Sequence, residues 1–230
     1  MADLQYPVIE TFTSIQGEGT RVGRVANFVR LAGCNLACRW CDTEYAWKPG
    51  VMTRPTPRAA AEIAAEAPAG ADIVITGGEP LLHNLCPLVG AFAGRHVTVE
   101  TNGTIPPSCV CVSLWSVSPK VGSSGHTPRP DVLEGLLKKS PSLIQFKFVV
   151  GGPGDLAEAL ALLASLPLVA VQGVPVILQP VGSPGDSREA SLGALEALAG
   201  MVVGSPDWAP YQVRVLPQLH RLLWGERRGA

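Results

Sequence analysis

Short apolar runs rich in β-branched residues alternate along this chain with helix-like stretches. The runs that predict strands cover residues 25–31, 72–78, 96–102, 111–118, 144–150, 174–181 and 211–217. The stretches that predict helices cover residues 57–67, 81–94, 130–139, 155–166 and 187–200. Near-continuous apolar strands that alternate with helices are typical of a parallel sheet buried on both faces. The pattern therefore predicts an α/β fold.

Polar residues gather at the points where these strands end. They are Cys34, residues 76–80, residues 101–103, residues 118–120 and residues 179–180. In a parallel barrel or open sheet the carboxyl ends of the strands share one face, where the active site is built. The sequence thus predicts one site at that face.

Three cysteines follow the first of these strands with the spacing Cys34-x-x-x-Cys38-x-x-Cys41. A cubane iron–sulfur cluster normally takes four cysteine thiolates. A loop that supplies only three leaves one iron open to a substrate or a cofactor. The spacing therefore predicts a reactive 4Fe–4S cluster rather than an electron-transfer centre.

Two alternative roles for these cysteines stay open on the sequence alone. Positions i, i+4 and i+7 would share one face of a helix, where cysteine packs as a small hydrophobic residue. A zinc site is the second, although zinc ligands usually come as two separated pairs. Cys86, Cys109 and Cys111 lack a matching spacing, and we expect them to be buried hydrophobic residues.

Composition limits the class of protein. The chain has 230 residues, of which 47% are hydrophobic and 16% charged, with a net charge of −1. This predicts a single domain, residues 1–230, with a sizeable core and no nucleic-acid partner, because such binding needs a basic surface. The most apolar stretch, 159–171, is too short to span a membrane and contains Pro167. The absence of a signal pattern and the uneven cysteines favour a cytoplasmic protein.

The strand end Gly77-Gly78-Glu79-Pro80, taken with the three cysteines, resembles the radical S-adenosylmethionine superfamily. In that superfamily the cysteines hold a 4Fe–4S cluster, and S-adenosyl-L-methionine chelates the fourth iron. The glycine-rich strand end receives the amino group of this cofactor. The reduced cluster then cleaves S-adenosylmethionine to a 5′-deoxyadenosyl radical.

A narrower resemblance covers residues 6–220. The segments 15–19 (IQGEG), 27–31 (NFVRL), 41–43 (CDT), 76–80 (TGGEP) and 100–104 (ETNGT) are similar to those of the 7-carboxy-7-deazaguanine synthase family. The resemblance implies ring contraction of 6-carboxy-5,6,7,8-tetrahydropterin to 7-carboxy-7-deazaguanine with loss of ammonia, in queuosine biosynthesis. It also implies a partial, open TIM-like barrel of mostly parallel strands, a magnesium ion (Mg2+), a homodimer, and an electron donor such as flavodoxin or ferredoxin.

The resemblance further implies roles for individual residues. The pterin would be bound by Ile15, Gln16, Gly17, Glu18, Arg30 and Thr76, with Arg30 paired to its carboxylate. S-adenosylmethionine would be bound by Gly78, Ser118, Pro119, Lys120 and Gln179, and magnesium by Thr43. For Arg30, Thr43 and Glu18 the alternatives are a surface salt bridge, a loop cap and a solvated turn charge.

Two rival functions remain open. An activase that makes a glycyl radical on a partner protein would share the cluster and the GGEP segment, but it would need a docking groove. A non-enzymatic iron–sulfur or zinc module would bind no S-adenosylmethionine. The chain also continues beyond His220, and the sequence leaves the placement of the tail, residues 218–230, undetermined.

Overall fold

The computed structural model describes residues 4–108, 111–139, 143–183, 185–225 and 227–229. Within these residues nine strands form one sheet in the order β3-β1-β2-β4-β5-β6-β7-β8-β9. They are β1 (Gln5–Ile15), β2 (Val25–Leu31), β3 (Thr56–Ala59), β4 (Asp72–Gly77), β5 (Val97–Thr101), β6 (Leu114–Val117), β7 (Ile144–Val150), β8 (Pro175–Pro180) and β9 (Gln212–Val215). β1 is antiparallel to both of its neighbours, and all other pairs are parallel. The sheet is open between β3 and β9, which confirms the expected open, mostly parallel architecture.

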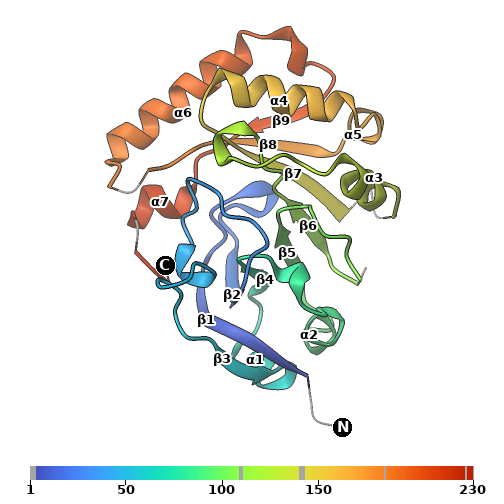
Figure 1. The fold of residues 1–230 in the computed structure, drawn as a ribbon, viewed down its shortest axis with the longest axis vertical. Coiled ribbons are helices and arrows are strands. Elements are labelled where there is room, and N and C mark those ends of the chain that lie inside the picture. The colour runs from blue at the N-terminus through green and yellow to red at the C-terminus, as the bar shows by residue number, and fades with distance from the viewer. Residues whose placement is uncertain (1–3, 109–110, 140–142, 184, 226, 230) are drawn as a thin grey trace.

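Within the described residues, six helices pack on one side of the sheet: α1 (Ala60–Glu66), α2 (Cys86–Ala91), α3 (Pro130–Lys139), α4 (Pro153–Ala164), α5 (Leu168–Val171) and α6 (Arg188–Val203). The last helix, α7 (Leu219–Trp224), adds no residue to this core and packs beside Gly17 instead. Short 3₁₀ turns accompany them: η1 (Gly19–Arg21), η2 (Glu44–Ala46), η3 (Pro80–Leu82), η4 (Gly122–Ser124) and η6 (Pro206–Trp208). Figure 1 shows α4 and α6 over β7–β9, with α3 beside β6 and β7. None of the helices in the described parts of the chain is long and apolar enough to cross a membrane.

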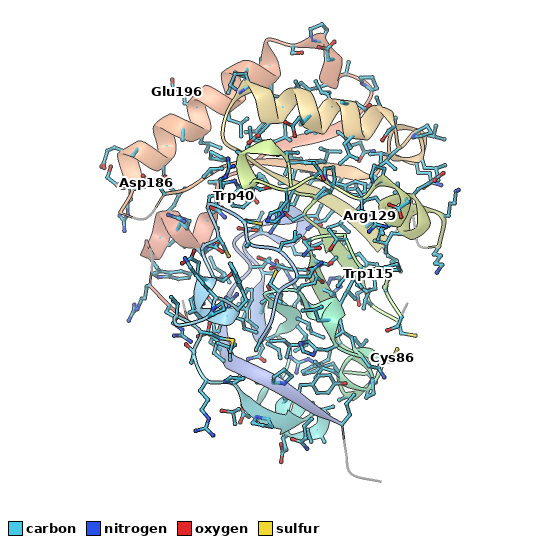
Figure 2. All side chains as sticks on the ribbon, in the orientation of Figure 1. Trp40, Cys86, Trp115, Arg129, Asp186 and Glu196 are labelled. Atoms are coloured by element: carbon cyan, nitrogen blue, oxygen red, sulfur yellow. The ribbon has the colours of Figure 1, made fainter. Side chains whose placement is uncertain are left out.

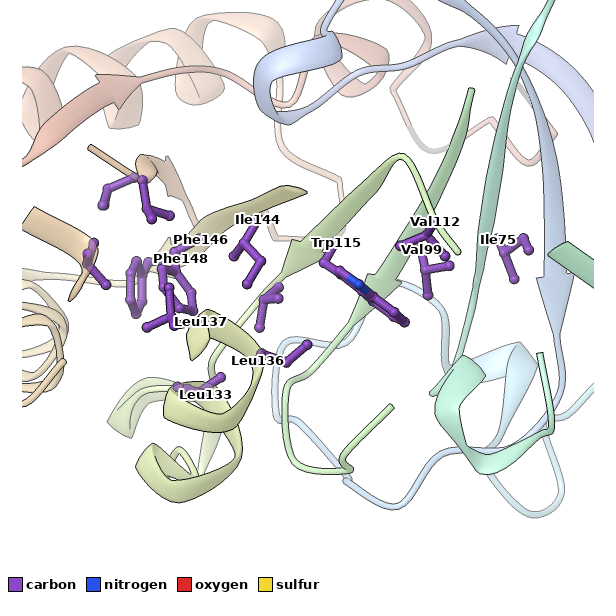
Figure 3. Packing of buried hydrophobic residues seen from close by; sticks show 14 of the residues in the cluster. Ile75, Val99, Val112, Trp115, Leu133, Leu136, Leu137, Ile144, Phe146 and Phe148 are labelled. Atoms are coloured by element: carbon purple, nitrogen blue, oxygen red, sulfur yellow. The ribbon is translucent and has the colours of Figure 1, made fainter. Parts of the chain in front are cut away.

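The main core lies between the sheet and these helices. Trp115 on β6 is fully buried, and α3 adds Leu133, Leu136 and Leu137. Figure 3 shows these leucines facing the aromatic residues of β7. Burying a large apolar side chain stabilises the fold by about 1.5–3 kcal/mol. The helices therefore hold the sheet rigid enough to position a site on its other face.

The opposite face of the sheet carries polar side chains; we call it the cavity face. Arg30 on β2 stands in register with Thr76 on β4, and Glu100 on β5 stands in register with Ser116 on β6. Thr76 and Glu100 are hydrogen-bonded to each other. Residues in register on parallel strands point to the same face. The cavity face is therefore a row of polar groups that crosses the sheet.

Strand prediction was most accurate for two largely apolar runs. The predicted strands 25–31 and 144–150 match β2 and β7 in both bounds, whereas the 111–118 run is a strand only over Leu114–Val117. The sequence pattern missed β1 and β3. These strands pair antiparallel at one side of the sheet, and β1 interleaves apolar with polar residues instead of forming an apolar run.

Helix prediction was less accurate at the ends. Helix 130–139 matches α3, but the predicted start of helix 57–67 is wrong because residues 56–59 pair with β1 as strand β3. The predicted helix 81–94 is reduced to Cys86–Ala91. The predicted helix 187–200 runs on to Val203, so Gly200 does not end it.

Candidate active site

A cavity of about 210 Å³ lies where the parallel strands end. Its lining includes most of the predicted site residues: Ile15, Gln16, Gly17, Glu18, Arg30, Cys34, Cys38, Cys41, Thr43, Thr76, Gly78, Ser118 and Lys120. Pro119 and Gln179 lie outside this lining. The structure thus brings cysteines from one loop and polar groups from several strands into a single chamber.

The cysteine loop is not a helix, which rules out a packed helix face as the reason for the spacing. Cys34, Cys38 and Cys41 are all half-buried. Two N–H groups donate to their sulfurs, because Leu36 N lies 3.5 Å from Cys34 Sγ and Trp47 Nε1 lies 3.3 Å from Cys41 Sγ. Such donors stabilise thiolate sulfur and tune iron–sulfur centres.

Contacts with a neighbouring segment fix the shape of this loop. Ala37 N donates to His126 Nε2 at 3.0 Å, Arg39 N donates to Ser124 O at 3.0 Å, and Trp40 Nε1 donates to Ser123 Oγ at 2.9 Å. The loop is therefore held from the segment that follows β6. His126, for which the sequence suggested no role, supports the cysteine loop.

The donor set fits a cluster better than a single ion. Among the described residues no group of three His, Cys, Asp or Glu side chains is arranged around one ion position. A cubane spreads its thiolates over different irons, so its ligands stand farther apart than those of zinc. Burial raises the pKa of the Cys34 and Cys38 thiols, so iron binding must release their protons. The three cysteines would hold the cluster.

The Gly77-Gly78-Glu79 turn packs directly on this loop. A Cβ at Gly78 would clash with the carbonyl of Gly33, and Glu79 N donates to that carbonyl at 2.7 Å. The glycine is therefore needed for close approach of the chain to itself. Glu79 is fully buried, and its carboxylate accepts from Leu81 N, Thr101 Oγ1 and Asn102 N at 2.7–2.9 Å. Burial raises its pKa despite these donors.

Glu100 organises the part of the cavity face next to the Gln16 segment. Its Oε1 accepts from Gln16 Nε2 at 3.2 Å, and its Oε2 accepts from Thr76 Oγ1 at 2.9 Å. Gln16 Oε1 in turn accepts from Glu18 N at 3.1 Å. Sequence reasoning did not single out Glu100, although a carboxylate within the buried strand VTVET was a usable signal.

Glu18 is a buried anion and not a solvated turn charge. Its Oε2 forms an ion pair with Lys147 of β7, and its Oε1 accepts from Gln218 Nε2 at 2.8 Å. Burial opposes ionisation, but Lys147 and His220 outweigh it and lower the pKa of Glu18 to about 2. In the same way Glu18 raises the pKa of Lys147 in spite of burial. Sequence reasoning also missed Lys147.

Arg30 is largely buried beside the cavity, in contrast to a surface salt bridge. Its Nε donates to Glu10 Oε1 at 2.8 Å, and its guanidinium lies 5.8 Å from the ring centre of Phe12 and 5.6 Å from that of Tyr45. The ion pair with Glu10 uses the N–H group on Nε. A guanidinium has five N–H donors, so Arg30 retains further N–H groups that can bind a ligand.

The remaining predicted residues are placed as follows. Thr43 lines the cavity and precedes η2 without a side-chain cap bond, so it is not a loop cap. Lys120 Nζ donates to Ser118 Oγ at 2.8 Å and lies 5.3 Å from the ring centre of Trp40. Gln179 is fully buried, and its Nε2 donates to Pro217 O at 3.2 Å. Its Oε1 has no hydrogen-bond partner among the described residues.

The tail packs against the site. Leu219 N donates to Gly17 O at 2.9 Å, and His220 lines the cavity. A Cβ at Gly17 would collide with the His220 ring. Gly17 therefore leaves the space that lets His220 reach the chamber.

The prediction that the remaining cysteines are buried is wrong for Cys86 and Cys111, which are exposed. Cys86 is the first residue of the short helix α2. Cys111 lies in the loop before β6 and is not part of a strand. In Figure 2 Cys86 stands at the rim of the molecule, well separated from Trp40 of the cysteine loop. Cys109 lies outside the described residues.

Known proteins share both the sequence and the fold. A family model described as "4Fe-4S single cluster domain" matches residues 15–105. The 7-carboxy-7-deazaguanine synthase of Pyrobaculum aerophilum is 36% identical over 236 residues, which cover 96% of each chain. That of Bacillus subtilis is 32% identical over 244 residues, covering 97% of this chain and 98% of the relative.

The crystal structure of QueE from Escherichia coli has a TM-score of 0.68 and 27% identity to this chain, covering 92% of this chain and 93% of that one. Its fold supports the open-barrel architecture. Because relatives with more than 30% identity match nearly the full length of both chains, this protein belongs to the 7-carboxy-7-deazaguanine synthase family of radical S-adenosylmethionine enzymes.

Proposed function

We propose that the cavity contracts the ring of 6-carboxy-5,6,7,8-tetrahydropterin to 7-carboxy-7-deazaguanine and expels ammonia. One observation carries this proposal: the three cysteine sulfurs and the polar row of Arg30 and Thr76 line the same chamber. A radical generated on the cysteine side would therefore form within reach of a pterin on the polar side. Proximity of this kind is a large part of the catalytic advantage of enzymes.

The cysteine side would hold the cluster and S-adenosylmethionine. When bound, this pair supplies a carbon-centred radical. Gly78, Ser118 and Lys120, which line the cavity, are proposed to bind S-adenosylmethionine. Pro119 and Gln179, which lie outside the lining, are proposed to complete this binding site. Among the described residues the buried Oε1 of Gln179 has no hydrogen-bond partner, and this available acceptor supports its place in the set. Burial lowers the pKa of Lys120, as expected of a chamber shielded from water.

The polar side would hold the pterin. Arg30 is proposed to pair with the substrate carboxylate, for which its planar fork is well suited. Gln16 and Thr76, both tied to Glu100, would bind the ring edge, and Ile15 and Gly17 would cover its face. The Glu18 carboxylate would support the pterin site indirectly, because both of its oxygens are already engaged by Lys147 and Gln218.

We also propose the finer properties of the protein. Thr43 would bind magnesium, with Asp42 beside it on the cavity wall. Oxygen ligands of this kind leave room for water and substrate in the coordination sphere. Residues 1–230 would form one radical S-adenosylmethionine domain, active as a cytoplasmic homodimer with flavodoxin or ferredoxin as electron donor. The continuous sheet from β3 to β9 supports the single domain.

Anaerobic turnover tests the function. The reconstituted protein is incubated with S-adenosylmethionine, a reductant, magnesium and the carboxypterin, and the product is identified by mass. The expected product has the mass of 7-carboxy-7-deazaguanine, with ammonia released in equal amount. A glycyl-radical activase, the rival prediction, would instead cleave S-adenosylmethionine and leave the carboxypterin unchanged.

A further inference from the structure

Glu10 of β1 connects the cavity with the end of the chain. Its Oε1 accepts from Arg30 Nε at 2.8 Å and from the Tyr45 hydroxyl at 3.0 Å. Its Oε2 accepts from Arg228 Nε at 2.9 Å. The carboxylate is largely buried and has an arginine on each oxygen. A residue of the C-terminal tail therefore shares one anion with the arginine that lines the cavity.

The same two arginines also share an aromatic ring. The guanidinium of Arg228 lies 4.0 Å from the ring centre of Tyr45, and that of Arg30 lies 5.6 Å from it. A guanidinium over a tyrosine face is held by the ring quadrupole. In Figure 1 the C-terminal end of the ribbon lies beside the η2 turn, which contains Tyr45. The Arg228 guanidinium therefore contacts both Glu10 and Tyr45 at this point.

Arg228 changes the net charge of the group around Glu10. Glu10 paired with Arg30 alone would carry one negative and one positive charge and so be neutral. With Arg228 the group of three carries two positive charges and one negative charge, which leaves one net positive charge. A net positive charge beside the cavity favours an anionic ligand. Two donors on opposite oxygens also fix the rotation of the Glu10 carboxylate, and hence the direction of Arg30.

We propose that Arg228 is a positioning residue for substrate binding: the tail holds Glu10, and Glu10 aims the free side of the Arg30 guanidinium at the substrate carboxylate. This inference rests on the proposed function, in which Arg30 binds that carboxylate. Preorganised charged groups bind more tightly because less ordering is left to the moment of binding. Arg228 itself does not line the cavity.

The adjacent Arg227 provides a matched control. It carries the same charge, is exposed, and makes no side-chain hydrogen bond or ion pair with any part of the described chain; its backbone N–H donates to Trp224 O at 3.3 Å. Arg228→Ala should raise the KM for the carboxypterin about three- to tenfold, the range for a partly exposed charged hydrogen bond, with kcat near the parent value. Arg227→Ala should leave both constants unchanged. Thermal unfolding of the two variants should coincide, which separates positioning from loss of folding.

Two further measurements sharpen the test. Arg228→Lys should restore only part of the affinity, because an ammonium cannot reproduce the planar fork on the carboxylate and the ring. Cleavage of S-adenosylmethionine without substrate should stay at the parent rate in Arg228→Ala, since the cysteine side is untouched. The KM difference between Arg228→Ala and the parent should shrink at high salt, because Arg228 is partly exposed.

The failures of the two proposals are distinguishable. A parent-like KM in Arg228→Ala, combined with a raised KM in Arg30→Ala, overturns the role of Arg228 and leaves the proposed function standing. Parent-like KM values in both variants overturn the carboxylate site itself. An equal rise in Arg228→Ala and Arg227→Ala would show a general charge effect of the tail and would also overturn the inference.

Discussion

Cys34, Cys38 and Cys41 differ from Cys86 in surroundings as well as in spacing. The three line the cavity, whereas Cys86 is exposed on α2. Cys38→Ala should therefore lose the visible iron–sulfur absorbance and all turnover. Cys86→Ala should keep both. Iron content and the absorbance spectrum after anaerobic reconstitution measure this, and full cluster content in Cys38→Ala would refute the assignment.

Thr43 tests the proposed magnesium site. Its hydroxyl lines the cavity and makes no cap bond to η2. A neutral hydroxyl is a weak ligand, so the ion should depend on the substrate and on water for most of its coordination. Thr43→Ala should lose magnesium stimulation of turnover yet retain the cluster. Equal stimulation in the variant and the parent would remove Thr43 from the metal site.

Arg30 tests the identity of the substrate. Truncating one partner of a buried, hydrogen-bonded charge pair costs roughly 2–5 kcal/mol. Arg30→Ala should therefore lower kcat/KM for the carboxypterin by about 30-fold or more. Arg30→Lys should recover only part of this loss, because an ammonium cannot form the bidentate fork. Steady-state rates at several substrate concentrations decide the point, and a parent-like kcat/KM in Arg30→Ala would contradict the carboxylate contact.

At the residue scale the sequence predicted residues that line the cavity better than the residues that support them. The cysteine spacing and the glycine turn are local, so they could be recognised along the chain. Glu100 and Lys147 act through partners far away in sequence, such as Gln16 and Glu18. A signal for Lys147 did exist, because β7 alternates Ile-Gln-Phe-Lys-Phe within a fully buried strand. A buried Lys at alternating positions implies a polar face with an anion opposite it.

At the element scale β7 and the loop after β1 are joined by the buried pair of Lys147 and Glu18. Removing one partner of such a pair leaves an uncompensated charge and costs about 3–5 kcal/mol. Lys147→Met should therefore lower the free energy of unfolding by about that amount. The double variant Glu18→Gln/Lys147→Met should recover a large part of the loss. Denaturant unfolding measures both, and equal stability of the single and double variants would show that the pair is not coupled.

The same pair predicts a pH dependence. The pKa of Glu18 falls from 4.5 to about 2 on folding. A depressed carboxyl pKa adds stability that is present above its unfolded value and is lost as the pH falls through its folded value. The parent should thus lose more unfolding free energy between pH 5 and pH 2 than the double variant does. Parallel pH profiles of the two proteins would contradict this.

Elements were predictable where local pattern and tertiary role agree. The largely apolar strands β2 and β7 and the amphipathic helix α3 were predicted with the bounds that the structure shows, because their patterns are strong. β1 and β3 form an antiparallel margin whose strand identity comes from pairing with each other and with β2. Local preference carries little information about such pairing.

At the scale of the whole molecule, segments from near both ends of the sequence line and support the cavity. The Gln16 segment and His220 line it, while Glu10 of β1 and Arg228 of the tail pair with each other outside the lining. The sequence could predict the open parallel sheet and the site at its carboxyl edge. It could not predict the tail, because α7 is short and its position depends on hydrogen bonds to Gly17 and Glu18, which are distant in sequence.

The central claim is that the radical source and the carboxypterin share this one cavity. The most direct test is to quantify 5′-deoxyadenosine and 7-carboxy-7-deazaguanine in the same anaerobic reactions, for the parent and for Arg30→Ala. The parent should form both, while Arg30→Ala should still form 5′-deoxyadenosine but little deazaguanine. Absence of 7-carboxy-7-deazaguanine from the parent reaction would contradict the account. Equal yields of 7-carboxy-7-deazaguanine from the parent and from Arg30→Ala would also contradict it.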